Sequence, residues 1–177
     1  MRVLIFGNAG QLGRDLTKVF GADAHVTGYD LPGVTITDPD AVDLVGVNDK
    51  PDLVVNAAAY TNVEGAEDHE VDAFAINETG ARIVAEASRA AGLPLVHIST
   101  DFVYDGQSTT PYEPTDAAHP LSVYGKSKLA GDIAVREANP HHFILRTVWL
   151  YGPGGNNFVE KIIAAAKRNP LLKVVSE

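Results

Sequence analysis

The sequence has no cysteine, one methionine, one tryptophan and no long hydrophobic run. Without cysteine it forms no disulfide and no cysteine-ligated metal centre, which fits a reducing cytoplasm. The apolar run near the N-terminus, Val3 to Phe6, is too short for a signal-peptide core or a membrane span, and no other stretch approaches the length of a span. We therefore expect a cytoplasmic protein without a membrane segment.

Positive charge is also scarce, because 14 lysines and arginines face 23 aspartates and glutamates, for a net charge of -9 at pH 7. A nucleic-acid backbone or an anionic membrane would be repelled on average, so general binding to either is not expected. A local pocket for one small anion is still compatible with this charge. The 177 residues, 45% of them hydrophobic, suffice for one domain with a substantial core.

Short, β-rich apolar runs alternate with longer segments of helical period along the chain. The expected strands are Arg2–Phe6, His25–Tyr29, Asp52–Asn56, Leu95–Ser99 and Phe143–Thr147. The expected helices are Gln11–Phe20, Asp40–Val47, Val71–Ala91, Ser122–Ala138 and Asn157–Arg168. This alternation predicts an α/β fold, a Rossmann-type doubly wound parallel sheet with helices on both faces.

Two further segments do not belong to this alternation. The polar stretch Asp105–Pro120 contains three prolines, and a loop of that length in a compact domain is usually functional or disordered. Leu171–Val175 is predicted to form one more strand, close to the end of the sequence. That strand either pairs back onto the domain or belongs to a segment that continues beyond it.

A glycine-rich turn follows the first expected strand directly and opens the first expected helix. Gly7–Gly13 has the pattern GxxGxxG, which allows a tight turn, a close approach of the backbone to a pyrophosphate, and anion binding at a helix N-terminus. The alternative is a glycine-rich turn without a ligand. Asp30, at the end of the second strand, has the spacing of a carboxylate that binds the adenosine ribose and favours NADH. Arg14 could soften that preference, so NADPH remains open.

A tyrosine and a lysine four residues apart, Tyr124 and Lys128, form the pattern YxxxK on an expected helix. Residues i and i+4 share a helix face, and a cation beside a phenol lowers the pKa of that phenol and eases proton transfer. The spacing also arises by chance on protein surfaces. Ser99 and Thr100 end the fourth strand, where a hydroxyl could bind a substrate carbonyl or simply cap the strand. The small residues of Asn56–Ala59 end the third strand at the same edge.

Together these residues resemble the extended short-chain dehydrogenase/reductase family. The matching stretches are FGNAGQLG, NAAAYTNVEGAE, HISTDFVYDG, PLSVYGKSKLAG and RTVWLYGPGGNNF, in that order between residues 6 and 158. The resemblance implies reduction of the 4-keto group of a nucleotide-linked 6-deoxy sugar by NADH or NADPH. It also implies a cofactor-binding and catalytic domain over residues 1–170, whereas residues 171–177 begin a substrate-binding domain that is largely absent.

The resemblance assigns roles to individual residues. Tyr124 would protonate the developing alkoxide, Lys128 would hold the nicotinamide ribose and tune Tyr124, and Thr100 would hydrogen-bond the keto oxygen. The implied cofactor contacts are Gly7, Gly10, Gln11, Leu12, Gly13, Asp30, Ala58, Ala59 and Lys128. The implied substrate contacts are Thr61, Val63, Asp101, Phe102 and Trp149.

The sequence also departs from the family pattern. Thr35 and Ile36 stand where related sequences carry an aspartate that contacts adenine, and we include them in the expected cofactor site. Some members bind Mg²⁺ through acidic side chains at a dimer contact, and Asp15 matches one such position, which leaves Mg²⁺ and a homodimer open. We expect no histidine metal site, because the adjacent His141 and His142 would point to opposite faces of a strand.

Other functions share this pattern. Another nucleotide-sugar reductase or an epimerase would keep the YxxxK pair, whereas a dehydratase is disfavoured because Asp101 is followed by Phe102 rather than by glutamate. A non-catalytic regulatory subunit, similar to that of methionine adenosyltransferase, is a third alternative. The intact set of Thr100, Tyr124 and Lys128 favours an enzyme.

Overall fold

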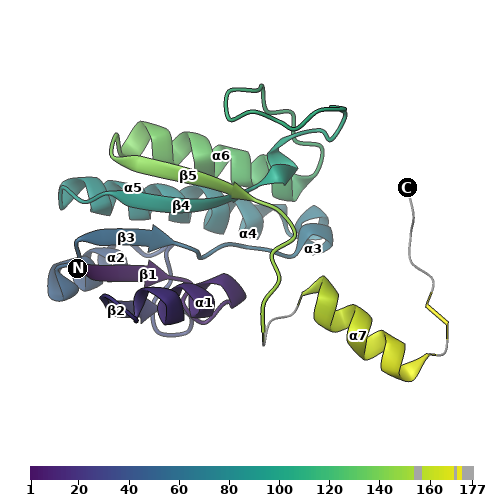
Figure 1. The fold of residues 1–177 in the computed structure, drawn as a ribbon. Helices are drawn as coiled ribbons and strands as arrows, with labels where there is room; N and C mark the ends of the chain where they lie inside the picture. Colours follow the sequence, from purple (N-terminus) through teal and green to yellow (C-terminus); the bar gives the residue numbers. More distant parts are fainter. Residues whose placement is uncertain (154–156, 170, 173–177) are drawn as a thin grey trace.

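The computed structural model describes residues 1–153, 157–169 and 171–172, and it contains one parallel five-stranded sheet (Figure 1). The strands lie in the order β2-β1-β3-β4-β5, and every neighbouring pair is parallel. Their bounds are β1 Arg2–Phe6, β2 His25–Tyr29, β3 Leu53–Asn56, β4 Leu95–Thr100 and β5 His142–Thr147. All five strands expected from the sequence are confirmed to within one residue, and so is the α/β class.

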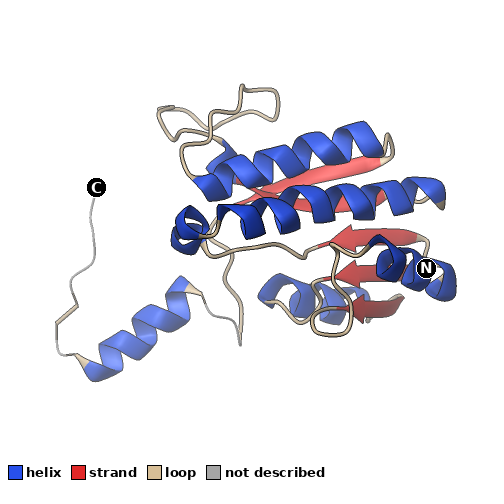
Figure 2. Ribbon diagram, turned by 180° about the vertical axis from the view of Figure 1, so that it is seen from behind, coloured by secondary structure: helices blue, strands red, loops and turns tan. Residues whose placement is uncertain are grey.

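Helices connect the strands and cover both faces of the sheet. The α-helices are α1 Gln11–Phe20, α2 Pro39–Asp49, α3 Val63–Asp68, α4 Glu70–Phe74, α5 Ala81–Ala90, α6 Val123–Ala138 and α7 Phe158–Arg168, with a π-helix η1 at Ala75–Gly80 and a 3-10 turn η2 at Asp101–Val103. Helix α1 lies on one face, while α2, α5 and α6 lie on the other (Figures 1 and 2). Helix α7 stands apart from the sheet (Figure 1).

The alternation of side chains along the central strands produces two cores. Leu4, Phe6 and Val54 point to one face, where they pack with residues of α2, α5 and α6. Val3 and Ile5 point to the other face, where they pack against residues of α1. Because both faces are covered, these strands carry continuous apolar runs instead of alternating ones.

Polar residues fix where several helices begin. Ser122 accepts a hydrogen bond from the backbone N–H of Gly125, and Asn157 accepts one from that of Glu160. Each is therefore an N-cap that lies one residue outside its helix, which accounts for the difference from the expected starts of α6 and α7. Asp38 caps α2 in the same way.

The long helix expected over Val71–Ala91 is wrong in detail, because the segment is divided into α4, the π-helical turn η1 and α5. The wider turn contains Asn77, whose side chain binds the backbone of Tyr60 and the hydroxyl of Ser127. The sequence analysis also missed α3, which begins at Val63 behind the cap Asn62. The bonds of Asn77 to residues distant in sequence thus accompany a break that the helical periodicity does not show.

The loop expected over Asp105–Pro120 is ordered by its own side chains. Tyr104 and Tyr112 stack with ring centroids 4.2 Å apart, and the Tyr112 hydroxyl donates to the Asp105 carboxylate at 2.8 Å. The strand expected over Leu171–Val175 lies mostly outside the described residues. No helix in the described part of the chain has the length and apolar character needed to cross a membrane.

Helix α6 approaches η1 so closely that only glycine fits at the contact, and this predicts a stability effect. A Cβ on Gly131 would lie 2.1 Å from the carbonyl oxygen of Asn77, which is backbone and cannot turn away. We expect Gly131→Ala to lower the free energy of unfolding by about 1–3 kcal/mol through overpacking, although helix propensity alone favours alanine by about 1 kcal/mol. Urea unfolding would measure the change.

Gly33→Ala is the matched control, because the added Cβ would meet the Asp30 carbonyl at an ordinary 3.5 Å. That variant should differ little from the unsubstituted chain. Equal stability of the Gly131→Ala variant and the unsubstituted chain would contradict the proposed steric limit.

Candidate active site

The candidate site lies at the carboxyl edge of the sheet, where the strand order reverses. From β1 the chain moves to β2 on one side and then to β3 on the other, so the two connections diverge at the end of β1. Open α/β sheets bind ligands at such a switch point. The glycine-rich turn that follows β1 and the small residues that follow β3 face each other there.

The close approach at this point requires glycine. Gly7 has φ +80°, and a Cβ on it would lie 2.5 Å from the backbone nitrogen of Ala58. A Cβ on Gly13 would lie 2.1 Å from the carbonyl oxygen of Gly7, so the first turn of α1 packs directly on the loop. The turn therefore presents its backbone and the start of α1 to the edge of the sheet without intervening side chains, as phosphate binding requires.

Asp30 closes the far side of this turn. Its carboxylate accepts hydrogen bonds from the backbone N–H groups of Ala9, at 2.9 Å, and of Leu31, at 2.8 Å. The Arg14 guanidinium donates to the carbonyl of Ala9 at 2.7 Å. The Asp30 carboxylate and the Arg14 guanidinium therefore both bind the backbone of Ala9.

A pocket of about 390 Å³ lies between the glycine turn, β2 and the segment after β3. Its lining includes the sequence-predicted residues Gly7, Gly10, Asp30, Thr35, Ile36, Ala58 and Ala59, and also Thr61, which was expected near the substrate. Gln11, Leu12 and Gly13 form the first turn of α1 beside it. The sequence analysis did not identify the lining residues Ala9, Tyr29, Leu31, Val34 and Ile76. Most of these are apolar residues without a motif, so no sequence signal marked them.

Helix α6 carries the predicted catalytic pair, and β4 carries the predicted hydroxyl. Tyr124 and Lys128 are four residues apart on α6, and Thr100 ends β4. Burial leaves Tyr124 only 9% exposed, and its ring meets that of Phe102 edge to face, with centroids 5.6 Å apart. The Thr100 hydroxyl donates to the Asp101 carboxylate at 3.1 Å and accepts from the backbone N–H of Phe102.

Lys128 is among the most buried charged side chains in the described part of the molecule, at 2% exposed. Its Nζ donates to the carbonyl of Ile98 on β4 at 2.7 Å. Burial lowers the pKa of Lys128 from 10.5 to about 8, and the charge of Asp132 opposes that lowering. The ammonium therefore titrates near physiological pH.

The pKa of Tyr124 lies above its ordinary value of 10.0, which differs from the sequence-based expectation that Lys128 lowers it. Burial is the largest cause, the charge of Asp101 adds to it, and a hydrogen bond with Thr100 opposes it. The physical reason for the difference is desolvation of the phenol, while the ammonium is directed to the Ile98 carbonyl. Thr100 is the group that favours the phenolate here.

The structure brings only some of the predicted substrate residues close to the predicted catalytic residues. Asp101 and Phe102 adjoin Thr100, and Val63 packs against the cluster that contains Tyr124. Trp149 instead packs edge-on against Phe158 of α7, with centroids 5.1 Å apart, and remains 70% exposed. Its φ of +52° is unusual for a bulky residue.

Asn77 is a residue of the site region that the sequence analysis did not single out. Its side chain accepts from the Tyr60 N–H at 2.9 Å and donates to the Tyr60 carbonyl and to the Ser127 hydroxyl. Ser127 in turn donates to the carbonyl of Tyr124 at 2.8 Å. This chain of bonds joins the segment after β3 to the catalytic helix. The sequence signal that could have marked Asn77 is a polar asparagine within the long helical pattern of Val71–Ala91.

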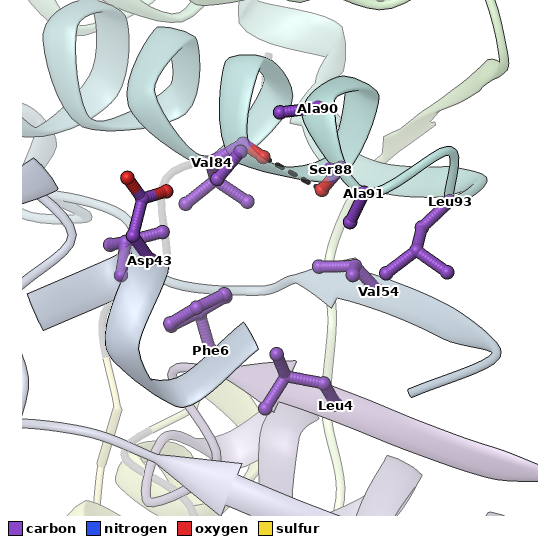
Figure 3. Close-up of a pocket in the computed structure, with 11 residues that line it drawn as sticks. Leu4, Phe6, Asp43, Val54, Val84, Ser88, Ala90, Ala91 and Leu93 are labelled. Carbon is purple, nitrogen blue, oxygen red and sulfur yellow. Dashed lines mark hydrogen bonds between the residues drawn. The ribbon is translucent and has the colours of Figure 1, made fainter. Parts of the chain in front are cut away.

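A second pocket, of about 320 Å³, lies between α2 and α5 (Figure 3). Buried aliphatic side chains such as Leu4, Val54 and Val84 form most of its wall, and the Ser88 hydroxyl is bonded to the carbonyl of Val84. This lining offers hydrophobic contact but no set of groups for catalysis. Within the described residues, no group of three or more histidine, aspartate or glutamate side chains is arranged to hold a metal ion, and Asp15 instead lies against Gly152.

Known proteins are similar to this chain in sequence and in fold. A curated dTDP-4-dehydrorhamnose reductase from Sinorhizobium fredii is 40% identical over all of this chain. The solved dTDP-4-dehydrorhamnose reductase of Clostridium acetobutylicum superposes with a TM-score of 0.94 at 41% identity, covering 99% of this chain and 62% of that one. The Bacillus anthracis enzyme in complex with NADP gives 0.92 at 39% identity, over 95% and 60% of the two chains.

The chain spans about 60% of the length of the Sinorhizobium fredii relative. The family model of the RmlD substrate binding domain matches residues 1–177, the whole sequence. The chain therefore belongs to the RmlD substrate binding domain family.

Proposed function

We propose that this chain forms the dinucleotide-binding and catalytic part of a dTDP-4-dehydrorhamnose reductase, which reduces the 4-keto group of its substrate to give dTDP-L-rhamnose. The observation that carries the proposal is the meeting of Thr100, Tyr124 and Lys128 at the same sheet edge as the glycine turn. The names of the most similar relatives support the choice of substrate.

The residues present fit a nicotinamide dinucleotide, because a pocket of about 390 Å³ is lined by Gly7 and Gly10, by Asp30, and by the small side chains of Ala58 and Ala59. The start of α1 would hold the pyrophosphate, and Asp30 would hold the adenosine ribose. When bound, the cofactor supplies the hydride for C4 of the sugar. A homologous structure in complex with NADP supports this part of the proposal.

The protein would supply the proton and the orientation. The Tyr124 hydroxyl gives its proton to the keto oxygen as the C4–H bond forms, and the resulting phenolate takes a proton back from solvent. Thr100 donates a hydrogen bond to the same oxygen and stabilises its developing charge. Lys128, as an ammonium, would bind the nicotinamide ribose, while the hydrogen bond with Thr100 favours the phenolate form of Tyr124.

Cofactor choice would depend on two side chains beside Ala9. The Asp30 carboxylate accepts from a ribose 2′-OH and repels a 2′-phosphate, so it favours NADH. Arg14 lies on the other side of Ala9 and could bind a 2′-phosphate. We propose use of both cofactors with a preference for NADH, in the cytoplasm. A homodimer and a Mg²⁺ ion at Asp15 remain expectations from the resemblance alone.

Replacement of the proton donor tests the catalytic assignment. In the whole protein to which this chain is proposed to belong, Tyr124→Phe should lower kcat for dTDP-4-dehydrorhamnose by about 10²–10⁴-fold, because general acid catalysis is lost. Oxidation of NADH and NADPH at 340 nm measures the rate, and fluorescence titration should show unchanged cofactor binding. A variant that keeps the full rate would contradict the role of Tyr124.

The 177 residues alone should bind the cofactor but turn over the substrate poorly. The glycine turn and Asp30 lie within the described residues, whereas we propose that residues 171–177 begin the domain that binds the nucleotide end of the sugar. Titration with NADH and NADPH should give saturable binding that is tighter for NADH, with turnover at least about 100-fold below that of the Sinorhizobium fredii relative. Turnover equal to that relative would contradict the proposed division.

Lys128 makes cofactor binding depend on pH. Its pKa in the fold is about 8, so the ammonium is present below pH 8 and is lost as the pH rises through that value. Affinity for NADH should therefore weaken above pH 8, and Lys128→Met should remove that dependence. The exposed Lys126→Met is the matched control and should keep the profile of the unsubstituted chain. A pH dependence that survives in Lys128→Met would exclude Lys128 as its source.

A further inference from the structure

Helix α6 buries a second charged residue one turn beyond the lysine of the site. Tyr124, Lys128 and Asp132 are spaced four residues apart, so they share one face of α6. Asp132 is fully buried at 0% exposed, and Lys128 is 2% exposed. A buried charge is costly unless it is paired, so the surroundings of Asp132 need an explanation.

Strand register brings a cation against Asp132 from the sheet. Arg146 on β5 is paired in register with Ser99 on β4, and its Nε and Nη2 both donate to Oδ2 of Asp132 at 3.3 Å. The guanidinium also donates to the Tyr104 hydroxyl and lies over the Tyr104 ring, 5.1 Å from its centroid. Arg146 is therefore held by the hydroxyl and the ring of Tyr104, and it binds one oxygen of the Asp132 carboxylate.

The other oxygen of Asp132 is not used in this way. Its Oδ1 is buried and accepts no hydrogen bond from the residues that the structure describes. Lys128 lies one helical turn away, and its Nζ donates to the Ile98 carbonyl at 2.7 Å, which satisfies one of the three ammonium protons. A buried carboxylate oxygen and a buried ammonium with spare donors thus occupy adjacent turns.

We propose that Asp132, anchored by Arg146, is a positioning residue that keeps Lys128 charged and oriented beneath the catalytic site. This inference rests on the proposed function and names a residue for it beyond the Thr100, Tyr124 and Lys128 set. The carboxylate acts through Lys128 and touches neither cofactor nor substrate. Its effect on Tyr124 is indirect, through the charge of the ammonium.

The other charged groups around Lys128 do not replace Asp132. His97 faces α6 from β4, and burial together with the charge of Lys128 lowers the pKa of His97 well below 6.5, so this ring is neutral at pH 7. On η2, Asp101 bonds to Thr100 and acts on Tyr124. Arg146, on β5, adds positive charge.

Acidic groups elsewhere in the surrounding elements are occupied in other ways. From α3, Glu67 accepts from the Val123 N–H at 2.8 Å and so caps the start of α6. Between α5 and the outer face of α6, Arg82 pairs with Glu137 at 3.8 Å. The charge of Asp132 is what opposes the desolvation of Lys128.

The competing explanation is purely structural. The Asp132–Arg146 pair could serve only to hold β5 against α6, in which case its loss would reduce stability and leave the titration of Lys128 unchanged. A measurement at Lys128 itself separates the two explanations. It requires no substrate turnover, so its outcome is independent of whether the proposed reaction is correct.

The test is carbon NMR of the 177-residue chain labelled with ¹³C at the lysine Cε. The signal of Lys128 is assigned by its loss in Lys128→Arg, and its pKa is read from a titration between pH 6 and pH 11. Asp132→Asn preserves the shape of the side chain but removes its charge. We expect the pKa of Lys128 to fall from about 8 by about one pH unit or more.

Two variants serve as controls. Glu137→Gln removes an exposed negative charge from the same helix and should leave the Lys128 titration in place. Asp132→Glu retains the charge, so it should keep the pKa of Lys128 close to the value in the unsubstituted chain. A folded Asp132→Asn variant in which the pKa of Lys128 is unchanged would overturn the proposal.

A second measurement keeps the proposal testable if Asp132→Asn does not fold. In the unsubstituted chain, the carboxylate carbon of Asp132 should shift as Lys128 loses its proton near pH 8, because the charge of each group acts on the other across one helical turn. The carbon of Glu137 should not shift there. A flat Asp132 signal through the titration of Lys128 would also overturn the proposal.

Discussion

The candidate site depends on how tightly α6 lies against the 3-10 turn η2 and the π-helical turn η1. Two glycines permit this contact: a Cβ on Gly125 would lie 2.2 Å from the carbonyl of Phe102, and one on Gly131 would lie 2.1 Å from that of Asn77. With the helix this close, Lys128 is only 2% exposed and its partners lie inside the protein. The backbone carbonyl of Ile98 and the charge of Asp132 are those partners.

This packing explains why the electrostatics of the site differ from the simple picture of a lysine that activates a tyrosine. Desolvation acts on three titratable groups where α6 meets its neighbours. It raises the pKa of Tyr124 and lowers the pKa values of Lys128 and His97. The three shifts all favour the neutral forms, as expected for low-polarity surroundings. Charge on Lys128 therefore has to be sustained by a counter-charge, and a buried carboxylate provides it at the cost of needing Arg146 as its own partner.

Much of this arrangement could be predicted from the sequence, and the limits of prediction have physical causes. The five strands were evident because apolar runs covered on both faces are continuous, and the glycine turn was evident because it follows a strand directly, opens a helix and is matched by Asp30. The helix over Val71–Ala91 was misjudged, since its periodicity is helical throughout and the break comes from the bonds of Asn77 to residues that are distant in sequence. Likewise, no local sequence pattern predicted that Trp149 would be exposed.

The roles of Asn77 and Asp132 could not be predicted from local sequence patterns. Each is polar, buried and bonded to residues that are distant in sequence, so its role appears only once the strands and helices are assembled. Asn77 joins the segment that lines the cofactor pocket to the backbone of Tyr124 through Ser127, and Asp132 joins Lys128 to β5 through Arg146. In the proposed reaction, hydride and proton must reach neighbouring atoms of one carbonyl group, which demands a fixed geometry between the two halves of the site. Buried hydrogen bonds and ion pairs are directional, whereas apolar packing is not. These two residues therefore fix the relative positions of elements that the hydrophobic core alone would hold less firmly.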